Sequence, residues 1–238
     1  MRRYLIVDDN RDFAENLAEI LRDDGDEVVV AGSGPDAIEA VRREPPFDAI
    51  LTDMRMPLMG GAEVVHEARR LDPEVAALVI TAHVGDDALE AARREGLLAV
   101  LPKPVKVPRL LEVLQSARRG GLVVIVEDDP RLADNLSEVL RTHGLAAVTA
   151  ASVLETERLG PVKPCCALVD LRVPGGPDGE AMRRLAEKYP SLPIVVITAH
   201  DKVAPPIPPA AFFRKPFDTG QLLATVEKFH AQAADAAR

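Results

Sequence analysis

Aromatic side chains are scarce in this chain. Of its 238 residues only 3% are Phe, Trp or Tyr, and Trp does not occur. Hydrophobic residues nevertheless make up 47% of the sequence, which is enough for ordinary packed cores. We therefore expect aliphatic cores and little disorder. The length is suited to one large domain or two domains of modest size.

Long apolar runs and an excess of positive charge are also missing. No stretch approaches the roughly 20 apolar residues of a membrane helix. The apolar run after Arg2 and Arg3 is too short for a signal peptide, so we expect a cytoplasmic protein. The net charge of −9 argues against a nucleic-acid-binding surface. The two cysteines, Cys165 and Cys166, are adjacent in an apolar run and are expected to be buried thiols.

What the chain does contain is one pattern that occurs twice. The segment LIVDDNRDFAENLAEILRDDG matches VIVEDDPRLADNLSEVLRTHG at a shift of 119 residues. Both segments carry apolar residues at the spacing of an amphipathic helix. These residues are Phe13, Leu17, Ile20 and Leu21 in the first copy and Leu132, Leu136, Val139 and Leu140 in the second. The repeat predicts two domains, which we divide into residues 1–119 and 120–238.

Each copy alternates short apolar runs with helical patterns. Runs such as Ala49-Ile50-Leu51 do not alternate with polar residues, which is typical of parallel strands covered on both faces. In the first copy we predict strands near 3–8, 27–31, 48–52, 76–81 and 97–101, and helices near 11–24, 35–43, 61–71, 86–95 and 107–118. The alternation predicts an α/β fold with a parallel sheet in each copy. Gly120-Gly121 is expected to end the fifth helix, which leaves a very short linker.

Five polar residues recur at matching positions in the two copies, each at or just past the end of a predicted strand. They are Asp8, Asp9, Asp53, Thr81 and Lys103 in the first copy and Glu127, Asp128, Asp170, Thr198 and Lys215 in the second. Ligands of open parallel sheets bind beyond the carboxyl ends of the strands. A set of carboxylates, a hydroxyl and an ammonium at that edge could hold a divalent metal and accept a phosphoryl group on a carboxylate.

These motifs resemble the receiver domain of two-component response regulators. IVDDN, LTDMRMPLMGG, VITAH and LPKPV carry the resemblance in the first copy, and IVEDD, LVDLRVPGGPDG, VITAH and FRKPF carry it in the second. The motifs occur in the same order in both copies, and the resemblance covers nearly the whole chain. It implies two flavodoxin-like (CheY-like) α/β domains in tandem, each a doubly wound five-stranded parallel sheet with the strand order 2-1-3-4-5.

The resemblance also implies a phospho-acceptor and a Mg²⁺ site in each copy. The expected acceptors are Asp53 and Asp170. The expected metal ligands are the acidic pair after the first strand, the acceptor and one backbone carbonyl. These are Asp8, Asp9, Asp53 and Arg55 in the first copy and Glu127, Asp128, Asp170 and Arg172 in the second. The resemblance also implies that the first acid of each pair acts through water, in keeping with the waters that bound Mg²⁺ usually retains.

The remaining residues of each set are expected, by the same resemblance, to contact the phosphate. The hydroxyl would come from Thr81 or Thr198, and the backbone N–H from Ala82 or Ala199. The ammonium would come from Lys103 or Lys215. Each lysine precedes a proline, and the resemblance implies a cis peptide bond there.

The second copy departs from the first between its threonine and its lysine. Only 17 residues separate Thr198 from Lys215, whereas 22 separate Thr81 from Lys103. The sequence DKVAPPIPPAA stands where the fourth helix is expected, and its prolines predict an extended connection instead of a helix. The aromatic residue that the family often carries three positions before the lysine is Phe212 in the second copy, but Val100 takes its place in the first.

We therefore expect a response regulator with two phospho-acceptor receiver domains and no output domain, which signals through phosphorylation-switched protein contacts. Its only catalysis would be Mg²⁺-dependent self-phosphorylation and self-dephosphorylation, so it is not expected to be an enzyme. The expected partners are a histidine kinase as phosphodonor and a downstream protein, and a homodimer is a further candidate. Neither nucleic acid nor a membrane is expected as a partner.

Three alternatives stay open at this point. The chain could be a fragment of a larger regulator or of a hybrid histidine kinase. It could also be a scaffold or phosphate sink in which one receiver is inert. A metal-dependent phosphatase is the third alternative. Such enzymes need a second aspartate two residues past the acceptor, and the arginines at these positions therefore weigh against it.

Overall fold

The computed structural model describes residues 1–44, 46–82, 95–160, 162–199 and 204–236. Its contacts divide the chain into two compact units. The first comprises residues 1–119 with 141–146 and 160–162, and the second comprises 120–140, 147–159 and 163–238. None of the described helices is both long enough and apolar enough to cross a membrane.

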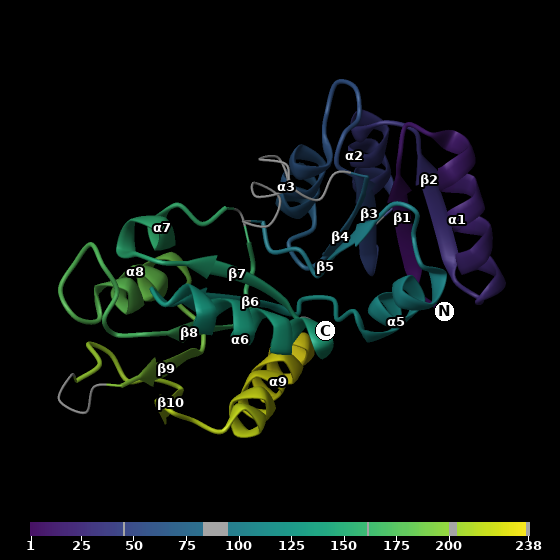
Figure 1. Cartoon of the computed structure of the whole chain (residues 1–238). Helices are drawn as coiled ribbons and strands as arrows, with labels where there is room; N and C mark the ends of the chain where they lie inside the picture. The colour runs from purple at the N-terminus through teal and green to yellow at the C-terminus, as the bar shows by residue number, and fades with distance from the viewer. Residues whose placement is uncertain (45, 83–94, 161, 200–203, 237–238) are drawn as a thin grey trace. The chain divides into compact units, whose positions relative to one another are not determined.

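The first unit is built on a five-stranded parallel sheet. Its strands are β1 (Arg3–Val7), β2 (Glu27–Ala31), β3 (Ala49–Asp53), β4 (Ala76–Thr81) and β5 (Ala99–Pro102). They lie in the order β2-β1-β3-β4-β5 (Figure 1). The described helices are α1 (Arg11–Asp23), α2 (Gly34–Arg43), α3 (Gly61–Leu71) and α5 (Val107–Ser116). The helix predicted at 86–95 falls almost wholly on residues 83–94, which lie outside the described residues.

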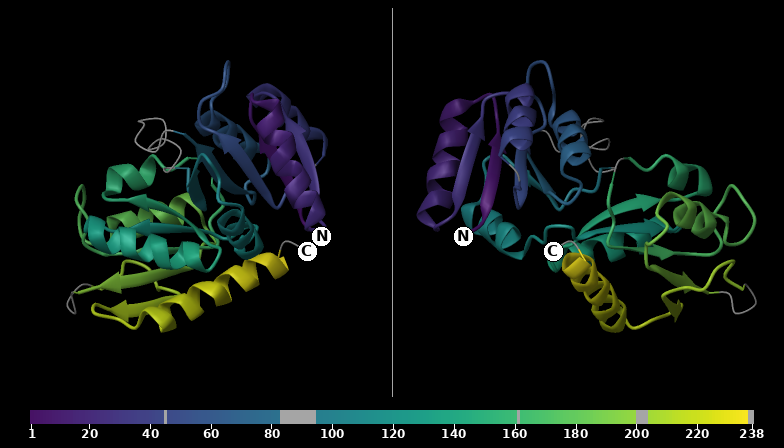
Figure 2. Two further views of the ribbon diagram at one scale, coloured as in Figure 1. Left: turned by 45° about the vertical axis from the view of Figure 1, so that its right-hand side comes forward. Right: turned by 180° about the vertical axis from the view of Figure 1, so that it is seen from behind.

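Local sequence explains where the first two helices begin. The Asn10 side chain accepts a hydrogen bond from the Phe13 N–H at 3.1 Å, so Asn10 caps α1. Ser33 caps α2 in the same way by accepting the Asp36 N–H at 3.3 Å. Helices α2 and α3 lie side by side on one face of the sheet (Figure 2), where they cover a hydrophobic cluster that includes Ile50.

The fifth helix ends earlier than predicted. It ends at Ser116, whereas Gly120-Gly121 was expected to end it. The guanidinium of Arg2 provides the physical reason, because it donates hydrogen bonds to three carbonyls in the last turn of the helix and just past it. These carbonyls belong to Leu114, to Gln115 at 2.7 Å and to Ala117 at 3.1 Å.

The second unit repeats the sheet of the first. Its strands are β6 (Leu122–Val126), β7 (Ala146–Ala150), β8 (Cys166–Val169), β9 (Ile194–Thr198) and β10 (Ala211–Arg214). The order β7-β6-β8-β9-β10 is again 2-1-3-4-5 when the strands are counted along this unit. The helices are α6 (Pro130–Thr142), α7 (Val153–Glu157), α8 (Glu180–Lys188) and α9 (Thr219–Ala236). Both units therefore have the predicted flavodoxin-like α/β fold.

Aliphatic side chains fill the second unit on both faces of its sheet. On one face Val124 and Val169 join a buried cluster with Met182 of α8. On the other face Leu168 lies among side chains of α6 and α9, which include Leu222. Both cysteines are buried free thiols, as the sequence predicted.

The connection between β9 and β10 carries the proline-rich sequence. Its residues 204–210 form neither helix nor strand, and residues 200–203 lie outside the described part of the chain. Ile207 packs against the same buried cluster that Met182 joins. Pro206 lies so close to Gly179 that a Cβ added to this glycine would be 2.6 Å from the Pro206 Cδ. The segment, which we call the proline strap (residues 204–210), therefore packs on the N-terminus of α8.

Candidate functional sites

The polar residues of the first unit meet because their strands are parallel neighbours. Asp8 follows β1, Asp53 ends β3, Thr81 ends β4 and Lys103 follows β5. These four strands are adjacent and point the same way, so their carboxyl ends share one edge of the sheet. Helix α3 begins against this edge at Gly61, where an added Cβ would lie 2.3 Å from the backbone oxygen of Asp53. Only glycine allows so close an approach.

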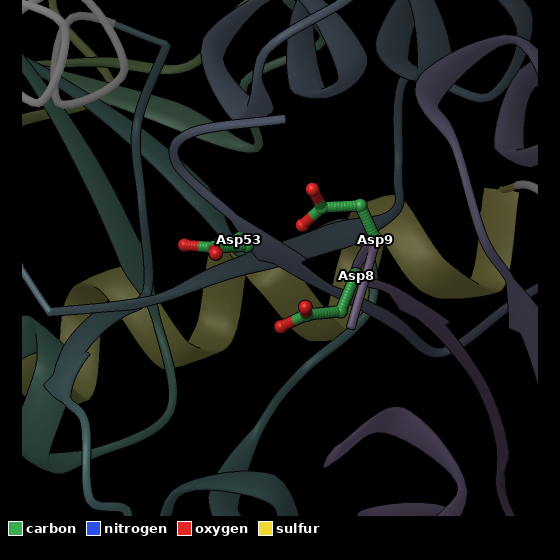
Figure 3. Close-up of side chains that lie close together, drawn as sticks. All are labelled: Asp8, Asp9 and Asp53. Atoms are coloured by element: carbon green, nitrogen blue, oxygen red, sulfur yellow. The ribbon is translucent and has the colours of Figure 1, made fainter. Parts of the chain in front are cut away.

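Three carboxylates gather at this edge. Asp8, Asp9 and Asp53 each offer an oxygen within 4.8 Å of the others, and Figure 3 shows them at the ends of β1 and β3. Asp8 is buried, Asp53 is partly buried and Asp9 is exposed, so the cluster opens to solvent on one side. Carboxylate oxygens are the ligands that hard divalent cations prefer. The first unit therefore contains an acidic cluster that is suited to a divalent cation.

Lys103 joins the buried carboxylate to the predicted acceptor. Its Nζ donates a hydrogen bond to Asp8 Oδ2 at 2.6 Å and another to Asp53 Oδ2 at 2.9 Å. The same Nζ lies 4.4 Å from the centroid of the Phe13 ring. The Lys103–Pro104 peptide bond is cis, as expected.

Burial and charge shift the pKa values of this network. Burial raises the pKa of the Asp8 carboxyl, and the hydrogen bond from Lys103 only partly offsets this effect. Burial alone would lower the pKa of Lys103. The hydrogen bonds to Asp8 and Asp53 outweigh it and raise the pKa of Lys103 above its ordinary value. Lys103 is therefore a cation at neutral pH.

The second unit assembles the same groups. Glu127, Asp128 and Asp170 each offer a carboxylate oxygen within 4.8 Å of the others. The Nζ of Lys215 lies 2.6 Å from both Glu127 Oε2 and Asp170 Oδ2, and the bond from Lys215 to Pro216 is cis. Burial raises the pKa of Glu127, and the two carboxylates raise the pKa of Lys215 although burial opposes them. Thr198 ends β9 and is buried, as Thr81 is in the first unit.

The acceptor carboxylates differ in their surroundings. Asp53 Oδ1 accepts the N–H of the next residue, Met54, at 2.6 Å, and 14% of the Asp53 side chain is exposed. Asp170 Oδ1 instead accepts the N–H of Arg172 at 3.0 Å, and only 8% of its side chain is exposed. Arg172 also forms an ion pair with Asp178, Nε to Oδ2 at 3.2 Å, within the same loop. The second acceptor is therefore the more enclosed of the two.

The other predicted site residues lie at the rims of the two sites. Ala82 and Ala199 directly follow the buried threonines and are exposed. The side chains of Arg55 and Arg172 are exposed and stand two residues past the acceptors. Sequence reasoning missed Phe13 as a site residue, since it assigned this ring to the buried face of the first helix. Its position five residues after Asp8 was the available signal.

Together the sheets and their polar edges define a class of protein. It has two CheY-like α/β domains, and each carries an acidic cluster and a lysine at the carboxyl ends of its strands. Comparison with known families agrees. The family model described as the response regulator receiver domain matches residues 4–115 and again residues 123–227. The chain belongs to the response regulator receiver family, and two receivers occupy almost all of its 238 residues.

Two relatives show how far the similarity extends. A response regulator receiver protein of Anaeromyxobacter sp. (strain Fw109-5) is 69% identical over 230 residues, which are 97% of this chain and 96% of the relative. The luminescence regulatory protein LuxO of Vibrio campbellii (strain ATCC BAA-1116) is 31% identical over 172 residues. That match covers 68% of this chain but only 38% of LuxO.

One solved structure illustrates the similarity to receivers of known structure. The chemotaxis response regulator CheY4 of Vibrio cholerae is 29% identical, with a TM-score of 0.45. This match covers 48% of this chain and 97% of CheY4.

Proposed function

We propose that this chain is a response regulator in which each of two receivers accepts a phosphoryl group on an aspartate, Asp53 or Asp170. Phosphorylation would switch its contacts with other proteins. The observation that supports this proposal most strongly is the lysine bridge. In each unit an ammonium lies within 2.9 Å of the acceptor carboxylate and of a buried acid on the neighbouring strand.

Each receiver would use Mg²⁺, which neutralises the charge of the transferring phosphoryl group when bound. The exposed acids Asp9 and Asp128 would hold the ion together with the acceptors and the backbone carbonyls of the arginines two residues beyond. Asp8 and Glu127 would contact it through water. The grouping of three carboxylate oxygens within 4.8 Å in each unit supports this assignment.

The protein's own residues would perform the transfer. An oxygen of Asp53 or Asp170 attacks the phosphorus of the donor, an acyl phosphate bond forms, and the donor's leaving group departs. The adjacent lysine faces the acceptor and would neutralise the phosphoryl oxygens. The threonine hydroxyl and the backbone N–H of Ala82 or Ala199 would complete the contacts to the phosphate. The added negative charge would then shift the receiver toward a conformation with a different protein-binding surface.

A phosphohistidine of a histidine kinase, or a small acyl phosphate, would be the donor. The output would be contact with a downstream protein or with a second copy of the chain, in the cytoplasm. Membership of the receiver family supports a histidine kinase as the donor, and the net charge of −9 argues against nucleic acid as the partner. We propose no activity on external substrates. Turnover of an added phosphoester would contradict that view.

The test is phosphorylation with acetyl phosphate and Mg²⁺, followed by intact mass. We expect wild type to gain up to two phosphates, Asp53→Asn and Asp170→Asn to gain one each, and the double variant to gain none. EDTA should abolish every gain. A wild-type chain that never gains phosphate would overturn the proposal.

A second candidate function has its own support. Because Asp170 is more enclosed than Asp53, the second receiver could serve as a scaffold that does not accept phosphate. A single phosphate in wild type that is lost only in Asp53→Asn would favour this scaffold over two active receivers.

A further inference from the structure

We propose that Phe13 is a positioning residue for Lys103, and that its aromatic ring makes the first receiver accept phosphate faster than it would with an aliphatic side chain there. The inference rests on the proposed function, because it assigns Phe13 a part in phosphoryl transfer to Asp53. It also predicts that the two receivers are kinetically unequal, because the second has no ring at the matching position.

The start of α1 sets the place of the ring. Asn10 caps the helix by accepting the Phe13 N–H, so Phe13 lies in the first turn, next to the end of β1. The side chain is partly exposed, whereas Leu17 and Leu21 of the same helix are buried. Phe13 therefore faces the polar edge of the sheet and is not part of the core that its helical spacing suggested.

The ring lies beside the ammonium of Lys103 together with two carboxylates. Asp8 and Asp53 accept hydrogen bonds from Nζ at 2.6 and 2.9 Å, and the Phe13 centroid lies 4.4 Å from the same atom. A cation within about 6 Å of a ring centroid is attracted by the negative face of the ring. The contact therefore favours the ammonium position that also faces the acceptor.

The ring and Asp8 share a property that Asp53 lacks: their attraction for the ammonium does not change during the reaction. Asp53 loses its charge as its oxygen bonds to phosphorus, so its hold on Lys103 weakens when the ammonium is needed by the phosphoryl group. Phe13 still attracts the ammonium at that moment. A flexible lysine that is held in place beforehand loses less freedom on the way to the transition state.

The second receiver supplies a natural control. Leu132 stands five residues after Glu127, as Phe13 stands five residues after Asp8. Leucine is apolar and of comparable reach, but it has no aromatic face to attract a cation. Leu132 is partly exposed, as Phe13 is. Phe13→Leu therefore removes the aromatic ring from the first receiver, and Leu132→Phe introduces one in the second.

The kinetic test follows one acceptor at a time. In the Asp170→Asn background, where mass gain reports Asp53 alone, we expect Phe13→Leu to lower the saturating rate constant for acetyl phosphate about two- to five-fold. The half-saturating donor concentration should not change. Phe13→Tyr, which keeps the ring, should retain the wild-type rate. In the Asp53→Asn background, Leu132→Phe should raise the rate at Asp170.

A graded series separates attraction by the ring from packing. Phenylalanines with one to five ring fluorines, incorporated at position 13, keep nearly the same shape but progressively lose the negative face of the ring. We expect the rate at Asp53 to fall stepwise along the series while the melting temperature stays level. A rate that is flat along the series, together with a slow Phe13→Leu variant, would reduce Phe13 to a packing role and overturn the proposal.

A second readout does not depend on phosphorylation. In chains with ¹³C-labelled lysine, the Lys103 ε-methylene protons should be shifted upfield by the Phe13 ring, and Phe13→Leu should abolish this shift. Absence of the shift in wild type would overturn the contact itself. A shift in a wild-type chain that puts no phosphate on Asp53 would overturn the proposed function, and with it the kinetic role, while the contact stands. A shift with an unchanged rate in Phe13→Leu would overturn the positioning role alone.

Discussion

Lys103 donates a hydrogen bond to Asp8 at 2.6 Å although 95 residues separate them in the chain. The same ammonium holds Asp53 at 2.9 Å, so it is the cation between two carboxylates. In the second receiver Lys215 has the same relationship to Glu127 and Asp170. The lysine therefore stabilises the site before any phosphate arrives, and this leads to the first prediction.

Replacing Lys103 with Met should destabilise the first receiver when Mg²⁺ is absent. The substitution leaves Asp8, whose side chain is 2% exposed, beside Asp53 without the ammonium that pairs with both. We expect the free energy of unfolding to fall by about 1–3 kcal/mol. Urea unfolding in EDTA measures it. Adding Asp8→Asn to Lys103→Met should recover most of the loss, and a single variant as stable as wild type would contradict the prediction.

Mg²⁺ should raise the melting temperature of the wild-type chain. A ligand that binds the native state alone at a hundred times its Kd stabilises that state by about 2.7 kcal/mol. Asp9→Asn combined with Asp128→Asn should remove most of the effect, because these are the exposed acids of the two clusters. Asp12→Asn, which neutralises an exposed acid in the first turn of α1, is the matched control. Calorimetry with EDTA and with Mg²⁺ measures the effect. Equal melting temperatures of the wild-type chain under both conditions would contradict the metal site.

Gly179→Ala should destabilise the second receiver more than Gly25→Ala destabilises the first. Both glycines have positive φ, +82° and +92°, so alanine is strained at either position. At Gly25 an added Cβ meets nothing within 4 Å, whereas at Gly179 it lies 2.6 Å from the Pro206 Cδ. We expect an excess loss of about 1–3 kcal/mol at Gly179, measured by urea unfolding.

Pro206→Ala provides the control for this steric effect. It removes Cδ and keeps Cβ, which lies at an ordinary 3.8 Å from the added atom. In the Pro206→Ala background the excess loss at Gly179 should largely disappear. If it persists unchanged, the proline strap does not pack on the start of α8.

Tyr4 should make the first receiver sensitive to alkaline pH. Burial, with a smaller contribution from Asp26, raises the pKa of Tyr4 from 10.0 to about 12. Below pH 10 the phenol is protonated in both states, and between pH 10 and 12 only the unfolded chain loses the proton. Tyr4 therefore contributes stability that is fully present below pH 10 and is lost as the pH rises toward 12.

The expected loss is about 1.4 kcal/mol per pH unit in this window. Tyr4→Phe is the reference, because it removes this titration and keeps every other. Urea unfolding of both chains from pH 9 to pH 12 measures the difference. If the free energies of unfolding of the two chains change with pH in parallel, the Tyr4 phenol titrates alike in the folded and unfolded chains.

Patterns within short windows predicted most of the fold. The apolar runs, the helical spacing and the repeat placed the strands and helices of the first receiver, except for the segment outside the described residues. They succeeded because a strand or an amphipathic helix is set by the spacing of apolar residues along a few turns of chain. Parallel pairing then brings the strand ends together, which is why Asp8, Asp53, Thr81 and Lys103 could be grouped before any coordinates.

Contacts between distant segments decided the rest. Arg2 ends α5 near Ser116 through carbonyls more than a hundred residues away, so the glycines at 120 and 121 were misleading. The helical spacing of Phe13 indicated a core residue, but its ring centroid lies 4.4 Å from the Lys103 ammonium at the polar edge of the sheet.

The sequence by itself determined the two sheets, their polar edges and the family, because these follow from local periodicity and from residues at strand ends. Only the tertiary structure decided which side chains surround each lysine, how enclosed each acceptor is, and where the proline strap lies. These features depend on the distances between segments that meet only after folding, and no local pattern encodes such distances.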